Sequence, residues 1–147
     1  MIHGILYRIP QTQTDRKTIE DNHAELVLNP SYQQIISLSS PQCWLAQATE
    51  KSESPLGNKQ VISRGSRFFI VAWARLDNHE KLAQDLDISL QELKALSAAD
   101  LILNAYVKFG SACTTKLVGD FSFAIYDNQE NILFCARDQM GIKPFYY

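Results

Sequence analysis

Three cysteines and three histidines are the side chains of this sequence best suited to nucleophilic, proton-transfer or metal chemistry. No two cysteines form a short Cys-x-x-Cys pair, and no second ligand lies at metal-binding spacing from a histidine, so neither a zinc site nor a disulfide framework is indicated. We expect buried structural thiols and solvated imidazoles at most of these positions. The thiols are Cys43, Cys113 and Cys135, and the solvated histidines are His23 and His79.

The composition indicates one globular domain with its own core. The chain has 147 residues, of which 46% are hydrophobic and 20% charged, and its formal net charge is −2. Because charges of both signs are interspersed, a basic face for nucleic acid is not expected. No apolar stretch approaches the roughly 18 residues that span a bilayer, and the start lacks the features of a signal peptide. We therefore expect a cytoplasmic protein without a membrane partner.

The residue pattern predicts strands that could position such side chains. Residues 2–9 form an apolar strand, and residues 61–63 and 68–73 flank a turn at Gly65. A second hairpin is predicted from residues 121–126 and 132–137. Both faces of its first strand are apolar or small, so this strand should be covered on both sides. The pattern favours two sheets packed face to face with helices outside.

Helices are predicted between the two hairpins. Asp77 or Asn78 can cap the first, and Ser89 with Glu92 and Ser97 with Asp100 match the capping-box pattern. The helix after Ser97 should end at Gly110 in a left-handed conformation. Its apolar residues are expected to face the core; they are Leu101, Ile102, Ala105, Tyr106 and Phe109. Residues 11–22 and 51–58 are polar and are expected at the surface.

Several motifs resemble the N-terminal glutamine amidotransferase domain of asparagine synthetases. Residues 119–127, 134–138 and 141–147 resemble its late segment, and residues 99–106 resemble the preceding helix. Residues 71–78 are similar to the variant in asparagine-synthetase-like enzymes that close lasso peptides. The resemblance implies an α+β, N-terminal-nucleophile-hydrolase-like fold, a four-layer αββα sandwich with two mainly antiparallel sheets. Residues 1–147 would then be one type 2 glutamine amidotransferase-like domain, incomplete at its C-terminus and without the synthetase domain.

The resemblance also implies a chemistry that this sequence departs from at its start. Active relatives expose a cysteine whose thiolate attacks the glutamine side-chain amide, with its own α-amine as base. His3 stands at that position here, and an imidazole is a poor substitute for a thiolate that must form an acyl intermediate. Because bulky Ile2 follows Met1, removal of Met1 is not expected. We therefore expect no nucleophile with a free α-amine, and a His3 side chain that packs into or seals an unused pocket rather than acting as a base.

Three further functions of the implied site are also unfilled. Trp73 and Ala74 stand where the resemblance implies an oxyanion hole made by an Asn side chain and the N–H of a Gly. Ala98 replaces the Asp that holds the substrate amino group, and Trp44 replaces the Arg that holds its carboxylate. Asp100 is expected to be occupied in helix capping. The adjacent pair at residues 137 and 138 is expected to form a structural ion pair and turn anchor.

The first hypothesis is a degenerate, glutaminase-inactive domain that supports the synthetase domain of an ATP-dependent amide ligase, of the lasso-peptide-cyclase or β-lactam-synthetase type. No catalytic residue, metal ligand or cofactor is expected on this chain, because it has neither a Ser-Gly-Gly-x-Asp-Ser loop nor another Gly-rich phosphate loop. ATP and Mg²⁺ would bind the synthetase domain, in cis or in trans. A peptide substrate and its maturation proteins are further expected partners.

Two alternatives remain open. The chain could be the glutamine-hydrolysing domain of an asparagine synthetase. It could also be a stand-alone module that binds a peptide or a protein in the pocket that holds glutamine in active relatives. The end of the sequence adds one structural expectation. Residues 142–147 should begin another strand, and an unprotected edge at Phe145, Tyr146 and Tyr147 should promote self-association.

Overall fold

The computed structural model describes residues 2–6, 21, 32–39, 43–50, 61–143 and 145. Its elements follow along the chain as β1 (Ile2–Leu6), β2 (Tyr32–Ser39), β3 (Cys43–Glu50), β4 (Val61–Arg64), β5 (Phe68–Leu76), α2 (His79–Asp85), α3 (Leu90–Leu93), α4 (Ala98–Phe109), the 3₁₀ helix η1 (Gly110–Lys116), β6 (Gly119–Asp127) and β7 (Ile132–Arg137). The predicted strands and helices between residues 61 and 137 are thus confirmed. The predictions for residues 7–9, most of 11–22, and 51–58 lie outside the described residues.

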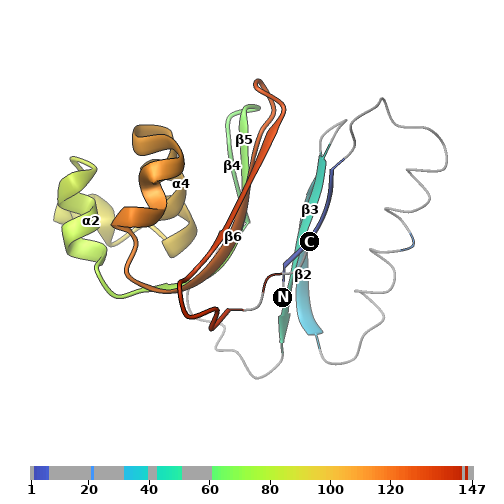
Figure 1. Ribbon diagram of the computed structural model, residues 1–147, viewed down its shortest axis with the longest axis horizontal. Coiled ribbons are helices and arrows are strands. Elements are labelled where there is room, and N and C mark those ends of the chain that lie inside the picture. The colour runs from blue at the N-terminus through green and yellow to red at the C-terminus, as the bar shows by residue number, and fades with distance from the viewer. Residues whose placement is uncertain are drawn as a thin grey trace.

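The strands form two antiparallel sheets that lie face to face. One sheet has the order β1-β3-β2, and the other has the order β4-β5-β6-β7. Figure 1 shows α2 and α4 on one face of the four-stranded sheet and the three-stranded sheet on the other face. The described residues therefore form a mixed helix and sheet structure in three layers. Helices over the outer face of the three-stranded sheet would come from residues outside the described ranges, so the expected fourth layer stays a prediction.

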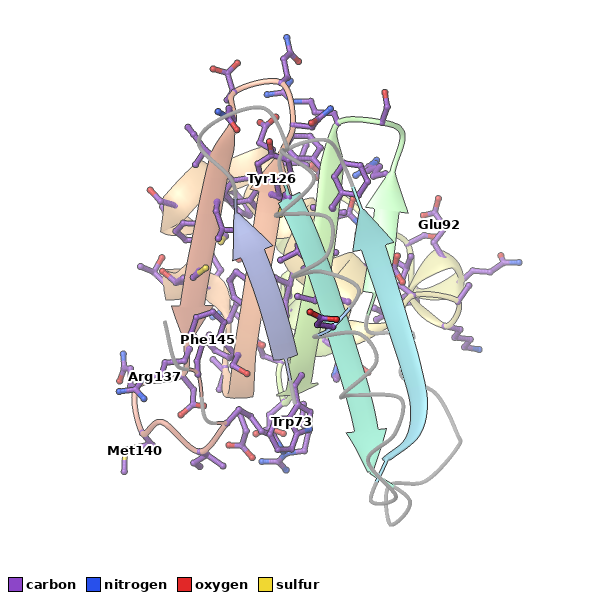
Figure 2. All side chains as sticks on the ribbon, turned by 90° about the vertical axis from the view of Figure 1, so that its right-hand side faces the viewer. Trp73, Glu92, Tyr126, Arg137, Met140 and Phe145 are labelled. Atoms are coloured by element: carbon purple, nitrogen blue, oxygen red, sulfur yellow. The ribbon has the colours of Figure 1, made fainter. Side chains whose placement is uncertain are left out.

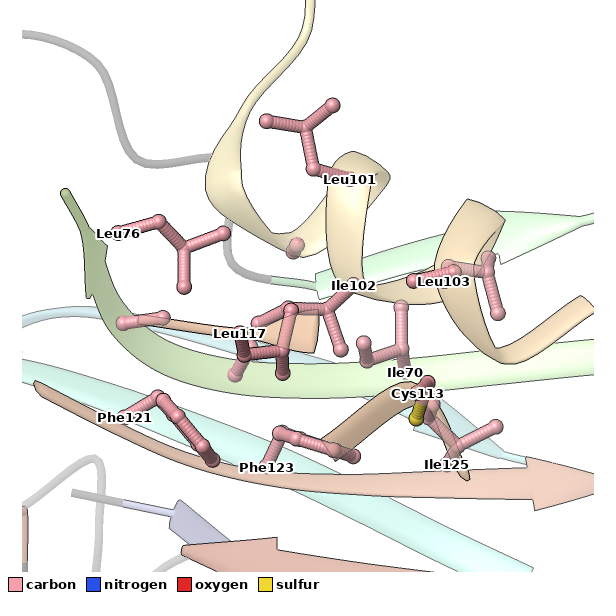
Figure 3. Packing of buried hydrophobic residues seen from close by; sticks show 14 of the residues in the cluster. Ile70, Leu76, Leu101, Ile102, Leu103, Cys113, Leu117, Phe121, Phe123 and Ile125 are labelled. Atoms are coloured by element: carbon pink, nitrogen blue, oxygen red, sulfur yellow. The ribbon is translucent and has the colours of Figure 1, made fainter. Parts of the chain in front are cut away.

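The larger core lies between the helices and the four-stranded sheet. Leu101, Ile102 and Leu103 of α4 are at most 2% exposed and pack with Ile70 of β5 and Phe123 of β6 (Figure 3). Burying each such side chain contributes about 1.5–3 kcal/mol, before the entropy cost of ordering it. The amphipathic pattern of α4 therefore fixes this helix on the sheet.

A second, smaller core lies between the two sheets. Cys43 and Leu45 of β3 pack with Val71 of β5 and with Ala124 and Tyr126 of β6. Since residues 121–127 are all buried, the prediction that this strand is covered on both faces is confirmed. Alternation along β5 then places Trp73 on the same face as Val71, toward the three-stranded sheet.

Two hairpins order the four-stranded sheet. The first turns at Gly65, whose φ of +62° fits the predicted tight turn, and β5 extends three residues beyond the predicted end at Trp73. Asp127 links the second hairpin to the first, because its carboxylate accepts hydrogen bonds from Nε and Nη2 of Arg67, in the first turn, at 3.1 and 2.8 Å. The backbone N–H groups of Gln129 and Glu130 also donate to this carboxylate. The pKa of Asp127 is therefore lowered, mainly by the Arg67 hydrogen bonds.

The predicted helix caps are only partly confirmed. Ser89 with Glu92 and Ser97 with Asp100 form complete capping boxes. Asn78 precedes α2, but its side chain makes no cap bond; it donates to the Lys116 carbonyl and accepts from the Val118 N–H. Gly110 does end α4, but its ψ of −142° is not the predicted left-handed helical value, because the chain continues directly into η1.

Two further expectations are wrong. Cys135 is exposed rather than buried, since β7 is the outer strand of its sheet. Residues 142, 143 and 145 are not in a strand; Phe145 instead packs against the core between the sheets. Tyr146 and Tyr147 lie outside the described residues, as does any edge that they would form. No helix in the described part of the chain has the length and apolarity to cross a membrane.

Candidate functional site

Four of the five expected site positions lie on strands that meet across the layer between the sheets. His3 of β1 pairs with Ala46 of β3, two residues along from Trp44, which pairs with Ile5. Both β1 and β3 contact β5, the strand that carries Trp73 and Ala74. The fold therefore brings these backbone positions to one region.

The Trp73 ring is covered by a lysine that the sequence pattern did not single out. The Lys143 ammonium lies 4.2 Å from the centroid of the Trp73 ring. Figure 2 shows Trp73 at the end of the sheet where the turn with Met140 also lies. A cation over an indole contributes about 0.5–2 kcal/mol, depending on how far it is desolvated. The ring therefore has a preferred position next to this turn.

Asp138 fixes the turn that carries Lys143. Its carboxylate is buried and accepts hydrogen bonds from the N–H groups of Phe121, Ile142 and Lys143, at 3.2, 3.0 and 3.3 Å. Burial alone would raise the pKa of Asp138, but these donors together lower it. The predicted turn anchor is confirmed. The predicted ion pair with Arg137 is wrong, because the Asp138 carboxylate accepts from backbone N–H groups and forms no ion pair with Arg137 among the described residues.

Ala74 and Ala98 lie on the other side of the four-stranded sheet from Trp73. Ala74 is 7% exposed and belongs to the core on the helix side, and Ala98, the first residue of α4, is partly buried against that core. Asp100 is occupied as expected, since its Oδ2 accepts bonds from the N–H and the hydroxyl of Ser97 at 2.9 and 2.7 Å. The structure therefore does not gather all the expected positions around one cavity.

Ser122 is a second residue that the pattern did not single out. In the sheet register it pairs with Trp73 on one side and with Arg137 on the other. Its side chain is fully buried, and its hydroxyl has no hydrogen-bond partner within the part of the chain that the structure describes. A hydroxyl between Phe121 and Phe123 is the signal in the sequence that could have drawn attention to it.

The three thiols are all unfavourable as nucleophiles. Burial raises the pKa of Cys43 to about 12 and that of Cys113 to about 11. Desolvation of the thiol also raises the pKa of Cys135, although the residue as a whole is exposed. Because the thiolate is the reactive form, none of them is activated at neutral pH. Among the described residues, no three His, Cys, Asp or Glu side chains gather as a metal site.

Comparison with known proteins places these features in a family. Residues 47–147 match the family described as "Glutamine amidotransferase domain". The chain is 33% identical over 94 residues to asparagine synthetase [glutamine-hydrolyzing] 3 of Bacillus subtilis, and 26% identical over 91 residues to asparagine synthetase [glutamine-hydrolyzing] 1 of the same organism. Each match covers 62% of this chain, but only 15% and 14% of the respective relative. Since the family match extends over more than half of the sequence, the chain belongs to the glutamine amidotransferase domain family.

Proposed function

We propose that this chain is a glutaminase-inactive amidotransferase-like domain of an asparagine-synthetase-like ATP-dependent amide ligase, of the lasso-peptide-cyclase or β-lactam-synthetase type. In this role the domain supports a synthetase domain and performs no reaction itself. The observation that carries the proposal is the Trp73 ring with the Lys143 ammonium 4.2 Å away. The resemblance implies a small hydrogen-bond donor at position 73, and a large capped ring occupies that position instead.

The N-terminal strand supports the same conclusion. His3 lies inside β1, after Ile2, so its backbone nitrogen belongs to a peptide bond and cannot serve as a free α-amine base in this chain. Its imidazole lacks the capacity of a thiolate to form and release an acyl intermediate. The nucleophile and the base are thus missing together, in addition to the oxyanion donor at Trp73 and the substrate-holding groups at Ala98 and Trp44.

A supporting role needs the fold but not the pocket. The core between α4 and the four-stranded sheet does not involve Trp73 or Lys143, so it can persist while the pocket changes. A ligase that joins an amine already present in its substrate has no need of ammonia. In that setting ATP and Mg²⁺ bind the synthetase domain, and a peptide with its maturation proteins is the partner of the whole ligase in the cytoplasm.

The alternative is an active glutamine-hydrolysing domain, and the names of the relatives favour it. The two Bacillus subtilis relatives are described as glutamine-hydrolysing asparagine synthetases. An active domain must bind L-glutamine before it can release ammonia. The two functions therefore differ in a property that can be measured without any turnover.

Isothermal titration of the purified chain with L-glutamine tests this difference. We expect no binding heat, because the Trp73 ring and the missing Asp and Arg leave nothing to hold the amino acid. Asparagine synthetase 3 of Bacillus subtilis, titrated in the same buffer, is the positive control. Saturable binding of glutamine, weakened by Ala98→Arg, would contradict the proposal and support an active amidotransferase.

A further inference from the structure

We draw no further inference here: the strongest candidate, the open groove between η1 and the turn after β7 with the exposed Val118, Met140 and Ile142 in its walls, carries no proposal because nothing in the described part of the structure shows what covers this apolar surface.

Discussion

Asp138 holds the turn whose Lys143 lies over the Trp73 ring. Its two carboxylate oxygens accept three backbone N–H donors, from Phe121 of β6 and from Ile142 and Lys143 of the turn. Lys143, whose backbone N–H donates to Asp138, also places its ammonium over the Trp73 ring. A single buried carboxylate thus couples the end of β7 to the position that the resemblance assigns to the oxyanion hole.

Replacing Asp138 with Asn should therefore destabilise the turn. The amide can accept at one oxygen only, so at least one buried N–H loses its partner, and we expect a loss of about 1–3 kcal/mol in the free energy of unfolding. Urea unfolding followed by circular dichroism measures this loss. Gln139→Ala, at the exposed neighbouring position, is the control and should change the stability little. An unchanged midpoint for Asp138→Asn would show that the three bonds do not hold the turn.

Stability should fall in acid because of two carboxylates. The pKa of Asp127 and that of Asp138 are both lowered in the folded chain. Groups of this kind stabilise the fold above their unfolded pKa of about 3.9, and the contribution is lost as the pH falls through the folded value. We expect the free energy of unfolding to decline over this acidic window. Arg67→Gln should make the decline shallower, because it removes the Asp127 hydrogen bonds; an equally steep decline would contradict this origin.

Removing the Ser122 hydroxyl should stabilise the folded chain. A buried hydroxyl without a partner costs about 1–3 kcal/mol, so Ser122→Ala should raise the free energy of unfolding by up to about that amount. The exposed Ser111→Ala is the matched control and should be neutral. The thermal midpoints of the two variants give the comparison. A clear loss of stability in Ser122→Ala would mean that the hydroxyl is satisfied in solution.

At the level of elements, Gly119 allows η1 and β6 to join beside β5. Its φ is +137°, and an added Cβ would lie 2.1 Å from the Arg75 carbonyl oxygen. We expect Gly119→Ala to cost more than about 2 kcal/mol, since both backbone strain and a clash with main-chain atoms oppose it. Gly65→Ala is the matched comparison, because φ is also positive there but no atom lies within 4 Å; about 1–2 kcal/mol is expected. Equal losses in chemical denaturation would show that the close approach to Arg75 is not important.

Elements governed by local chemistry could be predicted from the sequence, and those governed by distant packing could not. The two capping boxes and the turn at Gly65 depend on neighbouring residues, and they are confirmed. Asp77 or Asn78 was expected to cap α2, but the Asn78 amide bonds the Lys116 carbonyl and the Val118 N–H, 38 and 40 positions along the chain. Phe145 was expected in a strand, but it lies outside any strand and packs, partly buried, against the apolar layer between the sheets.

The candidate site shows the same limit. The resemblance identified Trp73 and Ala74 as replacements, and the strand positions of both could be predicted. The contact between Trp73 and Lys143 joins two segments far apart in the sequence, so no local pattern indicates it. The exposure of Cys135 depends on which strand lies at the edge of the sheet, a property of the topology. The site residues could therefore be named from the sequence, but not their surroundings.

At the level of the whole molecule, the cores of the described fold do not include the Trp73 and Lys143 contact. Two sheets and a helical layer are held by cores that leave out Trp73, Lys143 and the turn at Asp138. The proposed function therefore requires no change in these cores. The chain spans about a seventh of the length of the two Bacillus subtilis relatives.

Release of glutamate from L-glutamine by the purified chain is the most direct test of an inactive site. The protein is used at a concentration far above that of an ordinary assay, and asparagine synthetase 3 of Bacillus subtilis serves as the positive control. We predict no glutamate above the rate without protein, because His3 provides no thiolate and Trp73 provides no oxyanion donor of the right size. Glutamate that increases in proportion to the amount of chain, and disappears in His3→Ala, would contradict the proposed function.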